Sequence, residues 1–191
     1  MSKGRLEAFS DGVIAILITI MVLELKVPHG DTLEALRPLV PVFLSYVLSY
    51  IYLGIYWNNH HHMLHATGKV SGGVLWANHH LLFWLSLVPF ATGWMGENHA
   101  APLATAAYGV VLVCAAVAFT ILQKAIIKHQ GPESKLAAAV GKDFKGKVSI
   151  ACYLAGIAAS FLQPWIAIAL YAAVACIWFV PDKRIEARLG A

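Results

Sequence analysis

The stretch EAFSDGVIAILITIMVLELK, residues 7–26, decides the fold of the chain. Residues 12–23 are apolar enough for the centre of a bilayer, yet Ser10 and Asp11 stand before them and Thr19 lies among them. Polar side chains are costly inside a membrane, so those that occur there are functional candidates by default. This segment therefore predicts a first membrane helix with a polar beginning and a lone hydroxyl along its length.

The composition of the whole chain points to lipid. Of the 191 residues, 59% are hydrophobic and 13% are charged, and the mean hydropathy is +0.68. A soluble domain has about 25% charged residues, so this chain is expected to bury its surface in a membrane. The net charge of +4 does not indicate nucleic acid, because the basic residues flank apolar runs and form no solvated face.

Six apolar segments of near-spanning length follow one another, at about 9–27, 39–63, 74–95, 103–127, 148–162 and 165–180. A helix needs about 20 residues to cross a hydrocarbon core of ~30 Å. The last two segments are short, but one helix over both would reach ~50 Å, which is too long for a bilayer. Pro164 disfavours helix in the residue before it, so a tight hairpin is expected there. The chain is thus predicted to be a single domain, 1–191, with an all-α membrane fold of six transmembrane helices.

The Lys and Arg residues predict the orientation of these helices. With the N-terminus inside, twelve of the fourteen fall on the cytoplasmic side and only Lys26 and Arg37 lie outside. Cytoplasmic loops carry the excess of Lys and Arg, so both termini are expected in the cytoplasm. The twelve are Lys3, Arg5, Lys69, Lys124, Lys128, Lys135, Lys142, Lys145, Lys147, Lys183, Arg184 and Arg188.

The acid at the start of the first helix is expected to face protein. Asp11 lies five residues before Ile16, about 140° around the helix, whereas Ile16, Ile20 and Leu23 share one stripe that Thr19 borders. Candidate partners occur in WNNHHHMLH, residues 57–65, and LWANHHLLFW, residues 75–84, which meet the same side of the membrane. The residues that could hydrogen-bond an acid or an arginine of the first helix are Asn59, His60, His61 and Asn78.

The histidines raise the question of a metal site. His61 and His65 are spaced i, i+4, and His79 with His80 could add a ligand, but no Cys, Asp or Glu accompanies them at a useful spacing. A structural network is therefore favoured over a proton-linked role, and no metal is expected. The sequence also contains no nucleophile elbow, phosphate-binding glycine loop or pair of intramembrane carboxylates, so we predict neither an enzyme nor a cofactor.

Three motifs together resemble a known family. RLEAFSDGVIAILIT, with Arg5 three residues before Phe9-Ser10-Asp11, is similar to the signature of the bacterial relatives of the endolysosomal potassium channel. WNNHH from Trp57 and LWAN followed by Pro89-Phe90 resemble the same family, over roughly residues 5–95. The resemblance implies six helices per chain, a homotetramer in a bacterial inner membrane, and a central pore lined by the first helix, without the usual TVGYG filter.

The resemblance also implies roles for single residues. Ile16 would form the narrowest constriction, Leu23 a second apolar ring and Thr19 a polar layer, with Ile20 on the same pore-lining stripe. A polar network would hold the first helix against the second and third helices; its members are Arg5, Phe9, Ser10, Asp11, Trp57, Asn59, His60, His61, Trp76 and Asn78. The extra histidine at His62 departs from the family's pattern.

The leading hypothesis is a potassium channel, weakly selective over sodium, whose hydrophobic constriction serves as gate and filter. Rings of large apolar side chains gate by excluding water, and potassium gives up its hydration shell at a lower cost than sodium. The expected partners are three further copies of the chain, the lipid bilayer, and potassium and other monovalent cations. The alternatives are a proton-coupled transporter or proton-conducting channel that uses the histidines, and an assembly protein in which the stripe is a packing seam.

Overall fold

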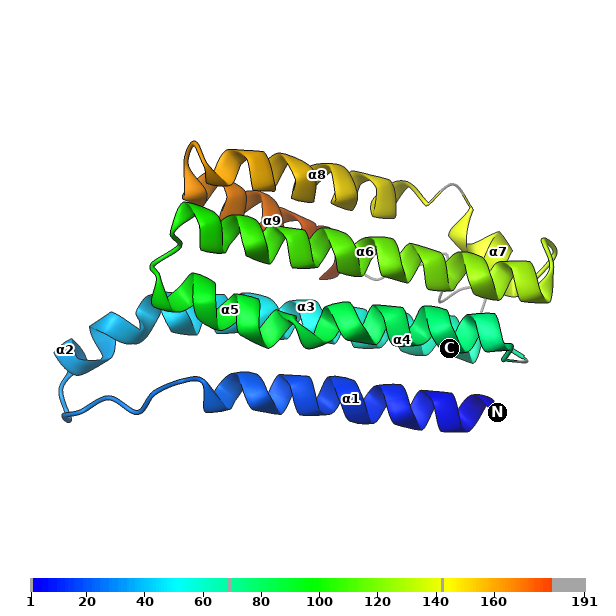
Figure 1. The fold of residues 1–191 in the computed structure, drawn as a ribbon, viewed down its shortest axis with the longest axis horizontal. Helices are drawn as coiled ribbons and strands as arrows, with labels where there is room; N and C mark the ends of the chain where they lie inside the picture. The colour runs from blue at the N-terminus through cyan, green and yellow to red at the C-terminus, as the bar shows by residue number, and fades with distance from the viewer. Residues whose placement is uncertain (1, 69, 142, 180–191) are drawn as a thin grey trace.

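The computed structural model describes residues 2–68, 70–141 and 143–179, and their regular secondary structure is entirely helical (Figure 1). The predicted all-α class is confirmed for the described residues. The helices are α1 (Lys3–Leu23), α2 (Leu33–Leu36), the 3-10 helix η1 (Arg37–Leu39), α3 (Val40–His65), α4 (Gly72–Ser86), α5 (Val88–Glu97), α6 (Pro102–Gln130), α7 (Lys135–Val140), α8 (Phe144–Ser160) and α9 (Pro164–Phe179).

Helix α1 begins six residues before the expected start at residue 9. Its first turns contain Lys3, Arg5 and Glu7, which suit the surface of a membrane and not its core. These residues are nevertheless good helix formers, so the helix extends beyond its apolar part. The apolar run therefore predicted the membrane part of α1 and missed its polar beginning.

The expected third segment, 74–95, is two helices that meet at Leu87. Pro89 is the second residue of α5, and it has no backbone N–H to donate to the carbonyl four residues before it. The ladder of helix hydrogen bonds is interrupted there, although the two helices follow one another as a continuous stretch of 26 residues, Gly72–Glu97. The break was readable from the sequence, because proline inside an apolar helical run commonly kinks the helix.

The last two helices form a hairpin at the expected position. Helix α8 ends at Ser160 and α9 begins with Pro164, where the fixed φ of proline suits the first turn of a helix. Within the described residues, four helical stretches are long and apolar enough to cross a membrane, and α9 is a shorter apolar helix. These four are Lys3–Leu23, Leu33–His65, Gly72–Glu97 and Pro102–Gln130.

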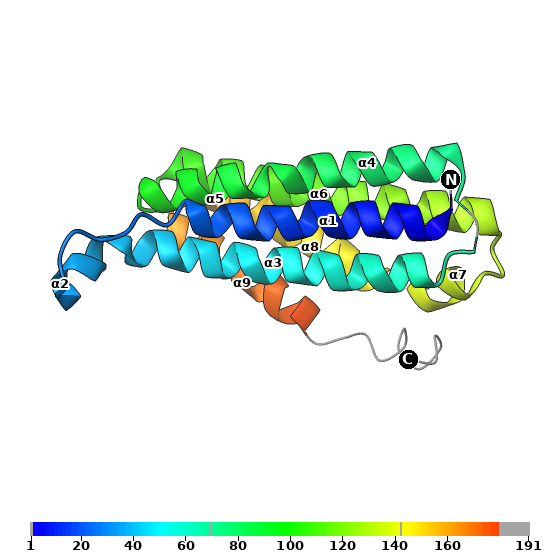
Figure 2. The ribbon, with the colours of Figure 1, turned by 90° about the horizontal axis from the view of Figure 1, so that it is seen from below.

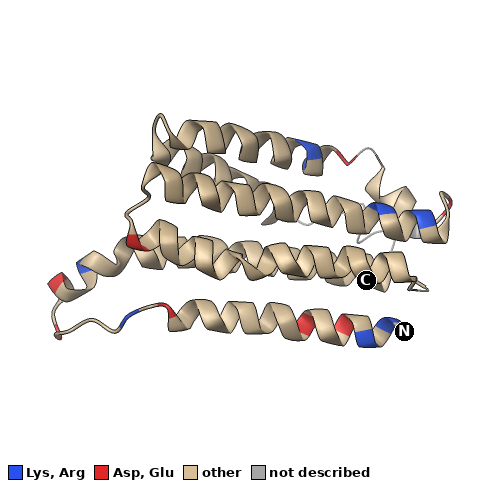
Figure 3. Cartoon of the chain, viewed as in Figure 1, with Lys and Arg blue, Asp and Glu red and all other residues tan. Residues whose placement is uncertain are grey.

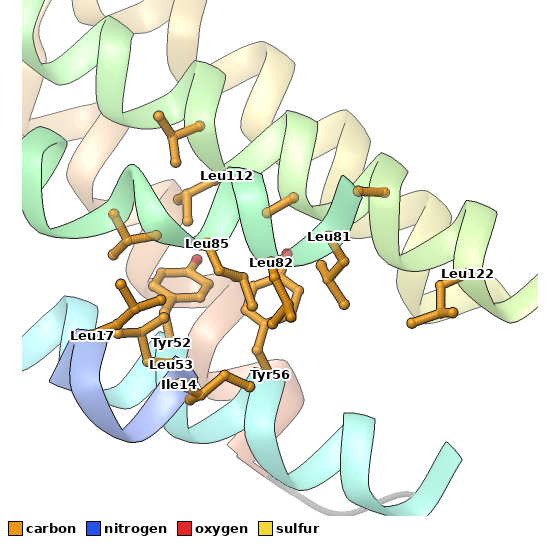
Figure 4. Packing of buried hydrophobic residues seen from close by; sticks show 14 of the residues in the cluster. Ile14, Leu17, Tyr52, Leu53, Tyr56, Leu81, Leu82, Leu85, Leu112 and Leu122 are labelled. Carbon is orange, nitrogen blue, oxygen red and sulfur yellow. The ribbon is translucent and has the colours of Figure 1, made fainter. Parts of the chain in front are cut away.

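Helix α6 is the centre of the bundle, because it packs against α4, α5, α8 and α9, whereas α1 packs along α3, α4 and α5 (Figures 1 and 2). Figure 4 shows the apolar contact under α1, where Ile14 and Leu17 lie beside Tyr52 and Leu53 of α3 and near leucines of α4. One whole side of α1 thus remains without a neighbour in the single chain.

The described charges gather at the two ends of the bundle (Figure 3). Lys and Arg occur at the start of α1, in the last turns of α6 and at the start of α8, all near one end. The other end combines Lys26 and Arg37 with several acids. Five of the basic residues that predict the orientation lie outside the described residues: Lys69, Lys142, Lys183, Arg184 and Arg188. Residue 180, at the end of the last predicted segment, also lies outside them.

Candidate functional site: the two faces of helix α1

Helix α1 has a buried face that binds it to the bundle. The buried side chains recur every three or four residues, which is the spacing of one helix face. They are Leu6, Ser10, Ile14, Leu17 and Met21. This face is polar only near the N-terminus of α1 and apolar over the rest, so the two halves are held by different kinds of contact.

The opposite face of α1 is an exposed stripe of large apolar side chains. The exposed fractions are 57% for Ile16, 40% for Ile20 and 80% for Leu23. Thr19 is also exposed, and its hydroxyl donates to the carbonyl of Ile16 at 2.9 Å. Because that bond uses the hydroxyl proton, the oxygen lone pairs remain available to accept or to face a cation. The four residues for which the resemblance implies a role in the constriction therefore lie together on the unpartnered side of the chain.

A buried chain of hydrogen bonds joins α1, α4 and α3. The Ser10 hydroxyl donates to the Leu6 carbonyl at 2.9 Å and accepts from the Asn78 amide nitrogen at 3.0 Å. The Asn78 amide oxygen lies 2.7 Å from Nε2 of His60. Since an amide oxygen only accepts, this order requires Nε2 of His60 to carry the proton. Ser10, Asn78 and His60 are all buried, and three helices meet through one ordered set of donors and acceptors.

Asp11 makes a second polar contact, to α3. The indole N–H of Trp57 donates to a carboxylate oxygen of Asp11 at 3.0 Å. Asp11 is half-buried, whereas Trp57 is exposed. Nearer the N-terminus, Lys3 donates to the His65 carbonyl at 3.0 Å and lies 3.7 Å from Glu7. The polar contacts of α1 with α3 thus occupy the first three turns of α1.

Stacked rings flank these contacts on both neighbouring helices. Phe9 stacks on His79 of α4, with ring centres 5.4 Å apart, and Trp76 lies 6.1 Å from the same imidazole. On α3, Trp57 stacks on His61 at 6.1 Å. The exposed side of the chain therefore carries aromatic rings on either side of α1.

Among the described residues, four members of the predicted network make no hydrogen bond to α1: Asn59, His60, His61 and Trp76. Asn59 donates to the Ile55 carbonyl in its own helix, and His61 contacts Trp57 by ring stacking. Arg5 is exposed and has no hydrogen bond or ion pair to any residue that the structure describes. Asn59 and Asn78 both lie two residues after a tryptophan, in Trp57-Asn58-Asn59 and Trp76-Ala77-Asn78, so their different orientations could not be read from the sequence. Within the described part of the chain, no group of three or more His, Cys, Asp or Glu is placed to hold a metal ion.

The structure also contains a buried cluster of hydroxyl groups that was not predicted from the sequence. Thr92 donates to the Val88 carbonyl at 2.7 Å and lies 2.6 Å from Ser49, whose oxygen is 2.9 Å from Tyr108. Because the Thr92 proton is used, Ser49 donates to Thr92 and Tyr108 donates to Ser49. The cluster ties α3, α5 and α6 together in the membrane. Isolated Ser and Thr within apolar runs were its only signal.

These features define a multi-pass α-helical membrane protein whose first helix is bound to the bundle by polar contacts at one end and leaves an apolar face uncovered. The family model described as the endosomal/lysosomal potassium channel TMEM175 matches residues 5–89. The chain belongs to this family of ion channels, and it is not an enzyme. The resemblance that the motifs of α1, α3 and α4 predicted is confirmed.

Individual relatives support the assignment over the whole chain. A protein named a potassium channel, from Chryseobacterium sp. (strain P1-3), is 57% identical over 189 residues, which cover 99% of this chain and 98% of that protein. The crystal structure of a lysosomal potassium-selective channel TMEM175 homolog from Chamaesiphon minutus matches with a TM-score of 0.81 at 29% identity, covering 93% of this chain and 96% of that one. The endosomal/lysosomal proton channel TMEM175 of Gallus gallus is 40% identical over 83 residues, covering 37% of this chain and 17% of that protein.

Proposed function

We propose that four copies of this chain form a potassium channel, weakly selective over sodium, with the exposed stripe of α1 lining the pore. The observation that carries the proposal is the exposure of Ile16, Thr19, Ile20 and Leu23 on a helix whose other face is buried. One α1 cannot enclose a pore, so a cyclic assembly must bring several copies around one axis. The relatives named as potassium channels, and the potassium-selective homolog of known structure, support potassium as the permeant ion.

In this proposal the stripe acts as both gate and filter. Ile16 and Leu23 are seven residues apart, so four copies of each would form two apolar collars ~10 Å apart along the axis. Collars of large side chains exclude water, and permeation then requires partial loss of the hydration shell. Thr19 lies between the collars and would offer the only hydroxyl oxygens along that path. No cofactor takes part; the permeant ion is the only ligand of the pore.

The polar network has a supporting role in the same proposal. Ser10 and Asp11 face α4 and α3, away from the stripe, and would fix the rotation of α1 about its own axis. Because rotation by one residue turns a helix by about 100°, a loss of this orientation would move Ile16 out of the pore. The six-span topology with both termini in the cytoplasm, in the cell membrane of a bacterium, is part of the proposal and is supported by the basic residues gathered at one end.

Reconstitution of the purified protein in planar bilayers tests the proposal. With opposed potassium and sodium gradients, we expect unitary currents whose reversal potential lies toward the potassium equilibrium potential. Crosslinking or native mass should give four chains per particle. A monomer, or an assembly in which α1 lies on the outside, would remove the pore.

A second candidate is proton conduction that depends on the histidines. It is favoured by the animal relatives, which are named proton channels, and by the exposed imidazoles of His61 and His79 beside α1. A proton-coupled transporter would instead give saturating flux that depends on His60 or His61. Currents that reverse at the proton equilibrium potential in the absence of potassium would select the proton channel.

A further inference from the structure

A cavity of about 50 Å³ lies among α3, α6, α8 and α9, near the start of α8 and apart from the exposed stripe of α1. By this measure one water needs about 10–15 Å³, so the cavity has room for roughly four waters or one small methylated ammonium group. Its lining combines aromatic rings with a few polar groups. Among the lining residues are Tyr56, Phe119, Trp178, Asn59, Gln123 and Asp143.

The carboxylate of Asp143 is held at the mouth of the cavity. Asp143 is the N-cap of α8, has a left-handed backbone with φ of 43°, and accepts the N–H of Gly146 at 3.2 Å. A methyl group on Gly146 would lie 2.6 Å from the other carboxylate oxygen, so only glycine lets the acid lie this close to the first turn. Helix N-termini ordinarily attract anions. Here Asp143 already occupies that position, which disfavours an anionic guest.

The rings of the lining suit a cation. Tyr56 and Phe119 form an edge-to-face pair with centres 6.0 Å apart and planes at 65°. The ammonium of Lys145 lies 5.7 Å from the centre of the Trp178 ring, so a cation already lies over one ring of this lining. Positive groups within about 6 Å of an aromatic face are attracted by the ring quadrupole, and quaternary ammonium groups are bound in this way by aromatic cages.

We propose that this cavity is a binding site for a small organic cation, a methylated or alkyl ammonium group, held between the Asp143 carboxylate and the Tyr56 and Phe119 rings. Lys145 and Lys147 lie on the same turn as the acid, so attraction from a distance is weak and the guest is held by contact. Asn59 and Gln123 complete the lining with amide groups that can solvate the positive charge. The site is independent of the pore and does not rest on the proposed function.

The test uses tetramethylammonium as the probe and the neutral tert-butanol, of similar shape, as its control. Thermal unfolding and ligand-observed NMR of the purified protein measure binding without any ion flux. Asp143→Asn keeps the cap and tolerates the left-handed backbone, so it removes only the charge. Phe119→Leu removes the ring but keeps an apolar side chain. Asp31→Asn, on the loop at the other end of the bundle, is the matched control.

We expect the unliganded Asp143→Asn protein to unfold like the parent, and tetramethylammonium to bind the parent in preference to tert-butanol. Asp143→Asn and Phe119→Leu should each weaken that binding about tenfold, and Asp31→Asn should not. Equal binding of the two probes, the absence of binding, or unchanged binding to Asp143→Asn would each overturn the proposal. In the last case tetramethylammonium binds elsewhere, for example in the pore, which the variant Ile16→Asn would then affect.

Discussion

The indole N–H of Trp57 donates to Asp11 at 3.0 Å, and this bond joins α3 to α1. In the proposed channel it would help to fix the rotation of α1 about its own axis, and so the direction in which the exposed stripe faces. Asp11→Ala should therefore lower the melting temperature and the tetramer fraction before it changes ion preference. A hydrogen bond to a charged group contributes about 1.5–3 kcal/mol, and the exposure of Trp57 places the expected loss at or below the lower end of that range.

A double-mutant cycle with Trp57→Phe measures this contact directly. If the bond is what Asp11 contributes, the two substitutions together should cost little more than either alone. Normal tetramers of Asp11→Ala with an altered potassium preference would mean that Asp11 faces the ion path.

Substitutions in the buried hydrogen-bonded set of Ser10, Asn78 and His60 should lower the stability of the protein more than the small volume of these side chains suggests. Ser10→Ala leaves the Asn78 N–H without its partner in a site that excludes water, and an unsatisfied buried donor costs about 1–3 kcal/mol. Ser86→Ala is the matched control, because Ser86 is exposed and its hydroxyl bonds only the Phe83 carbonyl of its own helix. Chemical unfolding in detergent should separate the two variants; equal midpoints would show that water reaches Asn78.

The stripe of α1 makes a prediction about permeation. Ile16→Ala should raise the single-channel conductance and reduce the preference for potassium, because a collar of methyl groups stays hydrated. Thr19→Val keeps the shape of the side chain and removes the hydroxyl, so it should change selectivity and leave assembly intact. Ile18→Ala is the control, since Ile18 is half-buried and packs against the core. An effect on selectivity from Ile18→Ala alone would place the pore along another face.

The sequence predicted the parts of this structure that follow from helical spacing and from proline. The 140° between Asp11 and Ile16 around the helix predicts that the acid faces away from the stripe. Pro164 predicts a tight hairpin, and α9 begins at this residue. The apolar run over 74–95 predicts one helix and does not show the break at Leu87, which Pro89 causes. The orientation of Asn59 toward Ile55, and the Ser49–Thr92–Tyr108 cluster, depend on contacts between helices that no local pattern encodes.

Two glycines make room for Tyr171 of α9, and their replacement should separate the helices around it. A methyl group on Gly156 of α8 would overlap the ring of Tyr171, and one on Gly109 of α6 would overlap its hydroxyl oxygen. Overpacking of this kind typically costs about 1–3 kcal/mol, so Gly109→Ala and Gly156→Ala should lower the melting temperature. Gly54→Ala in α3, where nothing lies within 4 Å, should instead be neutral or stabilising.

The ion pair between Lys26 and Glu97, 2.8 Å apart, gives a prediction for high pH. The hydrogen bond to Glu97 and its charge raise the pKa of Lys26 above the ordinary 10.5. A raised pKa means that the stabilisation is present below pH 10.5 and is lost as the pH rises through the higher folded value. The Lys26→Gln variant should therefore have a slightly lower melting temperature than the parent at neutral pH, and this difference should vanish in strong alkali. Both groups are exposed, so the effect is small at high salt.

Helix α1 is held by hydrogen bonds in its polar half and by apolar packing in the rest. In the proposed channel, a tilt of the helix would therefore pivot near Ser10. Among the described residues, the polar contacts that the helix makes with its neighbours lie between Lys3 and Asp11, whereas Ile14, Leu17 and Met21 are held by apolar packing, which is non-directional. Ile16 lies about 9 Å from Ser10 along the axis and Leu23 about 20 Å. For a given tilt about Ser10, the Leu23 collar of the proposed pore would then widen about twice as far as the Ile16 collar, and the polar end of the helix would stay in place.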